Sequence, residues 1–233
     1  MGADRRHLWL MLAATFATGV VDAVGFLGLD RVFTGNMTGN VVILGMALTG
    51  ADDFPVLGPA LALVGFMGGA VVGGRALRGR PHDWGVRVTG LFVIAGLMIV
   101  ACGVVLVLID KSPTSPTTVG LTTVLGMAMG VQASAARHLG VKDVTTVVVT
   151  STITGLSADS RLAGGAGTGW ARRLLAVALI LAGAAVGAVL LTWHLAAGPF
   201  LAGTVVIVVA LLGFLGMHSD RANRPPVPAP MSV

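Results

Sequence analysis

Long apolar stretches separated by short polar connections dominate this chain of 233 residues. Six of the stretches hold close to the roughly 20 residues that a membrane-spanning helix needs. They cover residues 8–29, 56–74, 88–109, 119–136, 174–193 and 199–217. Two shorter apolar segments, 33–49 and 144–158, are interrupted by Thr, Asn, Ser and Gly. The pattern predicts an all-α polytopic membrane protein and leaves open whether the two short segments cross the bilayer.

The composition supports this class and argues against several others. Charged residues make up 11% of the chain, whereas soluble domains carry about 25%. The only cysteine, Cys102, lies within an apolar stretch, which excludes a disulfide framework and a cysteine metal site. His138 and His194 lack partners at metal-ligand spacing, and no hydrolase, zinc-protease or P-loop motif occurs. We therefore expect no enzyme activity, cofactor, metal or nucleic-acid partner.

The 15 Lys and Arg residues decide between two topologies. If all eight apolar segments cross, these residues divide 8 to 7 between the two sides. If both short segments enter and leave on one face, the division becomes 13 to 2. Cytoplasmic loops of membrane proteins carry an excess of Lys and Arg. We therefore predict six transmembrane helices, two re-entrant or broken polar segments, and both termini in the cytoplasm of a bacterial inner membrane.

The two halves of the chain also resemble each other. Residues 14–45 align with 126–156 at an offset of 111 to 112, and 61–74 align with 175–188 at an offset of 114. Three crossings in each half would make the repeat inverted, as in many transporters. The predicted organisation is a cytoplasmic N-terminus (1–7), a first membrane repeat (8–109), a second repeat (119–217) and a disordered Pro-rich cytoplasmic tail (218–233).

The two polar segments carry the candidate site. Polar backbone at membrane depth is tolerated where it is buried in protein or lines a watery cavity, and inverted-repeat sites lie near the midplane. We predict Gly35 and Gly39 as backbone-turn residues. The predicted substrate-binding residues are Asp22, Thr34, Asn36, Thr38, Asn40, Thr146, Thr150 and Thr154. A purely structural reading, in which these segments break and pack helices, is the alternative.

Asp22 is the only acidic residue within a clear spanning segment. An intramembrane acid is a functional hypothesis by default: it could bind a cation, carry a coupling proton or hydrogen-bond a substrate. Alternatively it braces the re-entrant segment, with Arg31 or the Thr and Asn side chains of 34–40 as partners. Its counterpart in the second half is about Ala133, beside Gln132, so any acid chemistry is confined to one half.

Four glycines are predicted to pack helices against one another. They form small-xxx-small pairs at matching positions of the two halves, a pattern that brings membrane helices close together. They are Gly69, Gly73, Gly183 and Gly187. The glycine stripes could join the two halves of one chain or two copies in a homo-oligomer.

The segments VVDAVGFLGLDRVFTGNMTGNVVILGMAL and MGVQASAARHLGVKDVTTVVVTSTIT resemble the YoaK-like family of bacterial membrane proteins (domain of unknown function 1275). The resemblance extends over roughly residues 8–217. Its distinctive parts are the Asp22 region, the NMTGN segment and the DVTT segment. It implies a membrane protein of the bacterial envelope and no particular substrate.

Two functions remain open. The first is a small-solute secondary transporter or channel whose partners are the lipid bilayer and a small molecule or ion. The second is a non-transporting scaffold or assembly protein in which the polar segments pack helices and the Pro-rich tail is the working part.

Overall fold

The computed structural model describes residues 3–50, 54–109, 115–141 and 149–222. Over these ranges the chain is all-helical, with no β-strand. The α-helices are α1 (Ala3–Gly28), α2 (Met37–Ala47), α3 (Leu57–Leu77), α4 (Val86–Leu108), α5 (Ser115–Leu139), α6 (Val149–Ala158), α7 (Trp170–Leu191) and α8 (Ala197–Ala222). A single 3₁₀ turn, η1 (Arg161–Ala163), lies between α6 and α7. The predicted all-α class is confirmed.

Six of the helices in the described part of the chain are long and apolar enough to span a membrane: α1, α3, α4, α5, α7 and α8. They match the six predicted stretches. Pro59, Pro116 and Pro199 each fall in the first turn of a helix, where the missing amide hydrogen costs nothing. α8 continues to Ala222, so the predicted start of a disordered tail at 218 is too early. Residues 223–233 lie outside the described residues.

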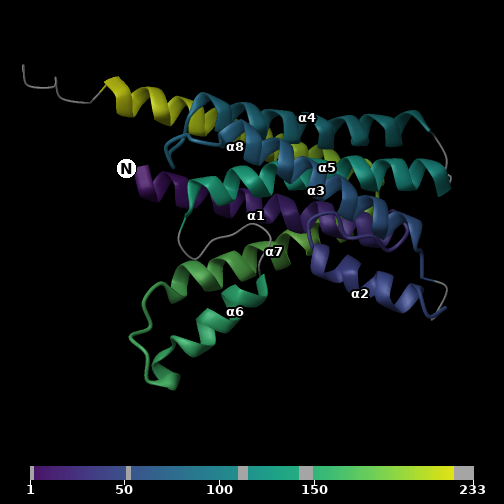
Figure 1. Cartoon of the computed structure of the whole chain (residues 1–233), viewed down its shortest axis with the longest axis horizontal. Coiled ribbons are helices and arrows are strands. Elements are labelled where there is room, and N and C mark those ends of the chain that lie inside the picture. The colour runs from purple at the N-terminus through teal and green to yellow at the C-terminus, as the bar shows by residue number, and fades with distance from the viewer. Residues whose placement is uncertain (1–2, 51–53, 110–114, 142–148, 223–233) are drawn as a thin grey trace, which may run out of the picture.

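The six long helices form one bundle, with the N-terminus of α1 and the C-terminal end of α8 at the same end (Figure 1). α1 packs beside α7 and α8, α5 packs beside α3 and α4, and α4 packs beside α8. α1 is the most buried of the spans and α7 the least. The core is therefore built around α1, the helix that carries Asp22.

Glycines lie where α1 crosses α7. A Cβ atom on Gly19 would meet the backbone carbonyl of Ile180, and one on Gly183 would meet that of Phe16. A Cβ atom on Gly187 would lie 2.8 Å from the carbonyl oxygen of Val20. The two helices approach each other along their backbones because these positions have no side chain.

The crossing of α3 and α5 is built in the same way. A Cβ atom on Gly69 would meet the carbonyl of Met127, one on Gly130 would meet that of Phe66, and one on Gly73 would meet the Ser134 hydroxyl. The four glycines predicted to pack helices thus all lie at helix crossings within one chain.

The two polar segments form the short helices α2, with 11 residues, and α6, with 10. At 1.5 Å per residue each is about 15 Å long, roughly half the apolar thickness of a bilayer. α2 packs beside α3, whereas α6 packs beside α7 and extends, with the start of α7, away from the other helices (Figure 1). The chain reverses after α1 through Asp30 and Arg31, whose φ angles are 62° and 58°.

Candidate functional site

Asp22 holds the non-helical segment that precedes α2. Its Oδ1 atom accepts hydrogen bonds from the backbone amides of Thr34 at 2.9 Å, Gly35 at 2.7 Å and Asn36 at 3.3 Å. The Thr34 hydroxyl is a further donor at 3.4 Å. These amides have no helical partner because they precede the first turn of α2. The bracing role predicted for Asp22 is therefore present, with backbone amides rather than Arg31 as partners.

Two asparagines complete this turn. Asn36 is the N-cap of α2, and its side chain accepts a hydrogen bond from the amide of Gly39. Asn40 is fully buried, and its side-chain amide pairs with both backbone groups of Phe33: Oδ1 accepts from the nitrogen at 2.9 Å, and Nδ2 donates to the oxygen at 2.6 Å. A buried backbone segment outside regular structure thereby obtains its hydrogen bonds from side chains.

Gly35 and Gly39 supply space rather than a left-handed turn. Neither has a positive φ angle, and the reversal occurs at Asp30 and Arg31 instead. A Cβ atom on Gly35 would lie 2.9 Å from Cγ2 of Thr18, and one on Gly39 would lie 2.6 Å from the Phe33 ring. The absence of a side chain at these two positions lets the segment approach α1 and its own preceding residues.

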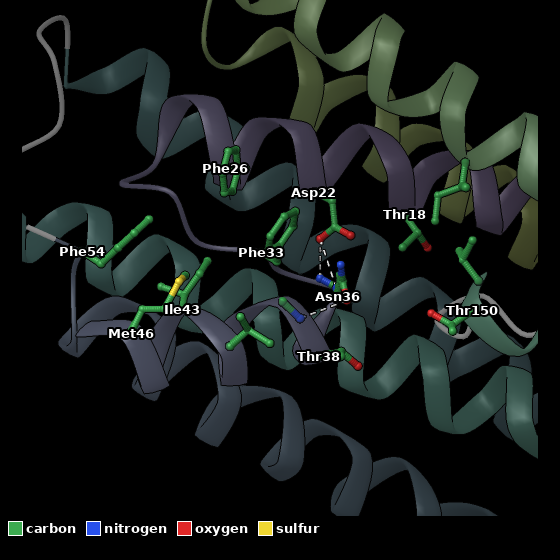
Figure 2. A pocket seen from close by; sticks show the side chains of 15 residues that line it. Thr18, Asp22, Phe26, Phe33, Asn36, Thr38, Ile43, Met46, Phe54 and Thr150 are labelled. Atoms are coloured by element: carbon green, nitrogen blue, oxygen red, sulfur yellow. Dashed lines mark hydrogen bonds between the residues drawn. The ribbon is translucent and has the colours of Figure 1, made fainter. Parts of the chain in front are cut away.

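A pocket of about 590 Å³ lies beside this turn, between α1, α2, α6 and α7. Its volume falls within the range of about 300–1,000 Å³ that is typical of small-molecule sites. Figure 2 shows Asp22, Asn36, Thr38 and Thr150 around it, together with Phe26, Phe33 and Phe54. The remaining lining residues are Thr18, Gly35, Gly39, Val42, Ile43, Met46, Val149 and Ile180.

Asp22 has no basic partner in the described part of the chain. No Lys, Arg or His of those residues forms an ion pair with it, and its second oxygen, Oδ2, receives no hydrogen bond from them. The side chain is only 8% exposed, yet it lines the pocket. A buried carboxylate without a counter-charge is costly unless a proton or a cation compensates it.

The structure distributes the predicted site residues over three environments. Asp22, Asn36, Thr38 and Thr150 line the pocket. Thr34 and Asn40 are fully buried behind it. Thr154 is exposed, and its hydroxyl donates to the Thr150 carbonyl of its own helix. Thr146 lies outside the described residues.

The site is displaced from the helix midpoint at which an inverted-repeat architecture predicts it. α1 has 26 residues, so at 1.5 Å per residue it is about 39 Å long. Asp22 precedes the last residue of α1, Gly28, by six positions, which is roughly 9 Å. Asp22 therefore lies about halfway between the middle of α1 and its C-terminal end.

Sequence reasoning missed the apolar lining and one polar neighbour. Thr18 and Phe26 line the pocket and lie four residues before and after Asp22. That spacing places all three on one helix face and could have identified them. Nothing local in the sequence indicates Phe54 or Ile180, because only the tertiary structure brings them to this pocket.

Gln132 of α5 is a buried link to the same part of α1. Its Nε2 lies 3.3 Å from the Thr18 hydroxyl and 3.5 Å from the Ala14 carbonyl oxygen. Its Oε1 has no hydrogen-bond partner within the described ranges. The predicted counterpart region of Asp22 therefore touches the helix that carries Asp22.

Comparison with known proteins fits this membrane architecture. The family model for "Protein of unknown function (DUF1275)" matches residues 10–212. The chain belongs to this family. Its DUF1275 relatives include the UPF0700 transmembrane protein YoaK of Bacillus subtilis (strain 168), with 32% identity over 161 residues, covering 67% of this chain and 68% of YoaK. No solved structure matches the chain.

Proposed function

We propose that this DUF1275 protein moves a small solute across the bacterial inner membrane, as a secondary transporter or channel. The observation that carries the proposal is the pocket of about 590 Å³ that contains the uncompensated Asp22 carboxylate. An ionisable residue inside a membrane protein commonly marks a solute or ion pathway. The pocket is lined by both predicted polar segments, through Asn36 and Thr38 of the first and Thr150 of the second.

The second element of the proposal is an inverted 3+3 repeat, which matched contacts support. A Cβ atom on Gly19 would meet Ile180 and Ala184, and one on Gly130 would meet Phe66 and Ala70. The two glycines are 111 positions apart in the sequence, and their corresponding partners are 114 positions apart. The same shifts relate the contacts of Gly69 with Met127 and Val131 to those of Gly183 with Phe16 and Val20.

The pair α4 and α8 behaves as expected for helices next to a two-fold axis. Gly96 contacts Gly203 and Ile207, while Gly203 contacts Gly96 and Val100. Residues that correspond in the two sets, Gly96 with Gly203 and Val100 with Ile207, are each 107 positions apart. Inverted repeats of this kind are a recurring architecture of secondary transporters, whose sites lie where the repeats meet.

The proposal places both termini in the cytoplasm, because basic segments gather at the end of the bundle that holds them. His7 lies 3.9 Å from Asp83, and the His82 ring stacks on that of His138. Thus the start of α1, the Arg-rich loop before α4 and the end of α5 are neighbours. By the positive-inside rule this end faces the cytoplasm.

The proposal also makes α2 and α6 re-entrant. Each is too short to span the bilayer, and α2 connects the end of α1 to the start of α3 at the same end of the bundle (Figure 1). Asp22 then lies on the outer side of the membrane midplane, since it is in the C-terminal half of α1.

Paired cysteine variants test whether the pocket holds water. Val42 lines the pocket, whereas its neighbour Val41 does not, and the two side chains are 56% and 55% exposed. In a Cys102→Ala background, we expect Val42→Cys to react with a membrane-impermeant maleimide added to intact cells. Val41→Cys should stay unreactive because it faces lipid.

Reaction of Val42→Cys at least about tenfold faster than Val41→Cys would support a solute pathway. The reagent is applied to intact cells and to inverted vesicles. If Val42→Cys and Val41→Cys react at equal rates in both preparations, the solute pathway is refuted. The polar segments would then be packing devices, as the scaffold hypothesis requires.

A further inference from the structure

We propose that the pocket selects a small organic cation, with a positively charged nitrogen facing Asp22 and an apolar body against the phenylalanines. This inference rests on the proposed function, because it names the class of solute that the same pocket takes.

Within the described part of the chain, the pocket lining carries one charged residue, and that residue is acidic. Among the described residues that line it, Asp22 is the only ionisable one. Its Oδ1 is held by the backbone of Thr34 to Asn36, which leaves Oδ2 for a ligand. A cation at Oδ2 would compensate the buried carboxylate, whereas an anionic solute would meet an uncompensated negative charge.

The groups that could have bound an anion are already occupied. The N-terminus of a helix ordinarily offers free backbone amides and about half a positive charge from the helix dipole. The amides of Thr34, Gly35 and Asn36 all point to Oδ1 of Asp22, and the Asn36 side chain caps the helix. When Asp22 is ionised, its full negative charge outweighs the partial charge of the helix dipole.

Aromatic rings and aliphatic side chains form most of the remaining lining. Phe26 and Phe33 stack on each other with ring centroids 4.8 Å apart, and both line the pocket with Phe54. The Phe54 ring already lies 5.5 Å from the guanidinium of Arg31, in cation–π geometry. The faces of such rings attract cations, and quaternary ammonium groups are recognised in this way.

The apolar residues argue against a bare inorganic cation. Na⁺ and K⁺ are coordinated by several oxygen atoms, and oxygen ligands are what hard cations require. Here Val42, Ile43 and Met46 of α2 and Ile180 of α7 contribute only apolar groups. A volume of about 590 Å³ accommodates an alkylammonium ion much better than one dehydrated metal ion. The polar neighbours Thr38 and Thr150 are neutral.

Charged thiol reagents test the sign of the pocket. A Thr38→Cys variant in the Cys102→Ala background is treated with 2-(trimethylammonio)ethyl methanethiosulfonate and, separately, with the anionic 2-sulfonatoethyl reagent. Rates are normalised to those of free 2-mercaptoethanol. We expect the cationic reagent to be favoured about tenfold, a modest effect for a carboxylate in a partly desolvated site.

The matched variant is Asp22→Asn, whose side-chain oxygen can still accept the three amide hydrogen bonds. It should bring the normalised ratio to within about twofold of unity, while Asp159→Asn, at an acidic residue outside the pocket, should leave it unchanged. If Asp22→Asn does not fold, Thr150→Lys places an ammonium group in the pocket and should likewise abolish the preference.

The organic part is tested by protection of Thr38→Cys against the cationic reagent. Tetramethyl-, tetraethyl- and tetrapropylammonium bromide should slow the reaction increasingly, whereas KCl at equal ionic strength should not. Equal protection by KCl would overturn the assignment to an organic cation. If both thiol reagents react at a normalised ratio near unity, the cation inference fails and the solute pathway stands. If neither reacts from either side of the membrane, the proposed function itself fails.

Discussion

The two short helices, α2 and α6, are anchored in different ways. The segment before α2 is held by a carboxylate from another helix, and Asp22 receives three of its amides. α6 is instead tied to α7, where Arg173 donates to the Gly155 carbonyl and to Asp159 at 2.7 Å. The position in α5 that corresponds to Asp22 is Ala133, which has no carboxylate.

This difference distinguishes the frame of the molecule, which is the packing of its six long helices, from the polar site around Asp22. Helix crossings at Gly19 and Gly183 recur at Gly130 and Gly69, so the frame follows the proposed repeat. Within the described residues, a carboxylate that holds backbone amides ahead of a short helix is found in the first half, at Asp22. On the proposed repeat, a duplicated frame would hold a single asymmetric site, and changes in the two halves should have unequal consequences.

Removing the carboxylate should have the largest effect. Asp22→Ala leaves three backbone donors without their acceptor, and we expect a loss of about 3 kcal/mol in unfolding free energy, or roughly 10 °C in Tm. Circular dichroism melting in detergent measures it. Asp22→Asn retains an acceptor and should lose less than half as much. Equal losses in the two variants would show that charge, rather than capping, stabilises the turn.

Matched glycine substitutions should affect both halves equally. Gly69→Ala and Gly183→Ala each place a Cβ atom against a backbone carbonyl, of Met127 and Phe16 respectively. Overpacking of this kind costs about 1–3 kcal/mol, and we expect about 2 kcal/mol from each. Gly68→Ala, where no atom lies within 4 Å of the new Cβ, is the control. Losses that differ more than twofold between the halves would contradict a shared frame.

Asn40 is specific to the first half and should be sensitive. Asn40→Ala removes both hydrogen bonds to the backbone of Phe33 in a fully buried site. Leaving these groups unpaired should cost about 1–2 kcal/mol. The same melting experiment measures the cost, and hydrogen exchange of the Phe33 amide should accelerate. Unchanged exchange would mean that another group holds this turn.

The tie between α6 and α7 should matter less. Arg173→Ala removes donors to Gly155 and Asp159, whose side chain is 56% exposed. An ion pair that is open to solvent on one side contributes about 1 kcal/mol or less. We expect a small change in Tm and faster proteolysis near η1. A loss as large as that of Asp22→Ala would make the two halves equivalent after all.

The smallest effect is expected at Thr154. Its hydroxyl bonds the Thr150 carbonyl within one helix and it does not line the pocket. Thr154→Val should change the free energy of unfolding by less than about 0.5 kcal/mol. It should leave thiol reactivity in the pocket unaltered. Thr150→Val, which alters a lining residue, should instead change that reactivity. If Thr154→Val alone does so, the described boundary of the site is wrong.

The sequence by itself determined the membrane class, the six long helices and their approximate limits. These depend on the length and hydropathy of continuous segments, and a span of roughly 20 apolar residues has few other stable outcomes in a bilayer. It also singled out Asp22, because one acidic residue in an apolar helix is visible without any structure. Thr18 and Phe26 were available from the same helical spacing.

Only the tertiary structure decided which polar residues face the pocket and which serve the fold. Thr34, Asn36, Thr38 and Asn40 look alike in the sequence, yet Thr34 and Asn40 are buried, and Asn36 and Thr38 line the pocket. Their fates depend on where the chain reverses after α1 and on how α7 brings Ile180 and α6 toward α2. Such contacts join residues more than 100 positions apart, and local pattern carries no information about them.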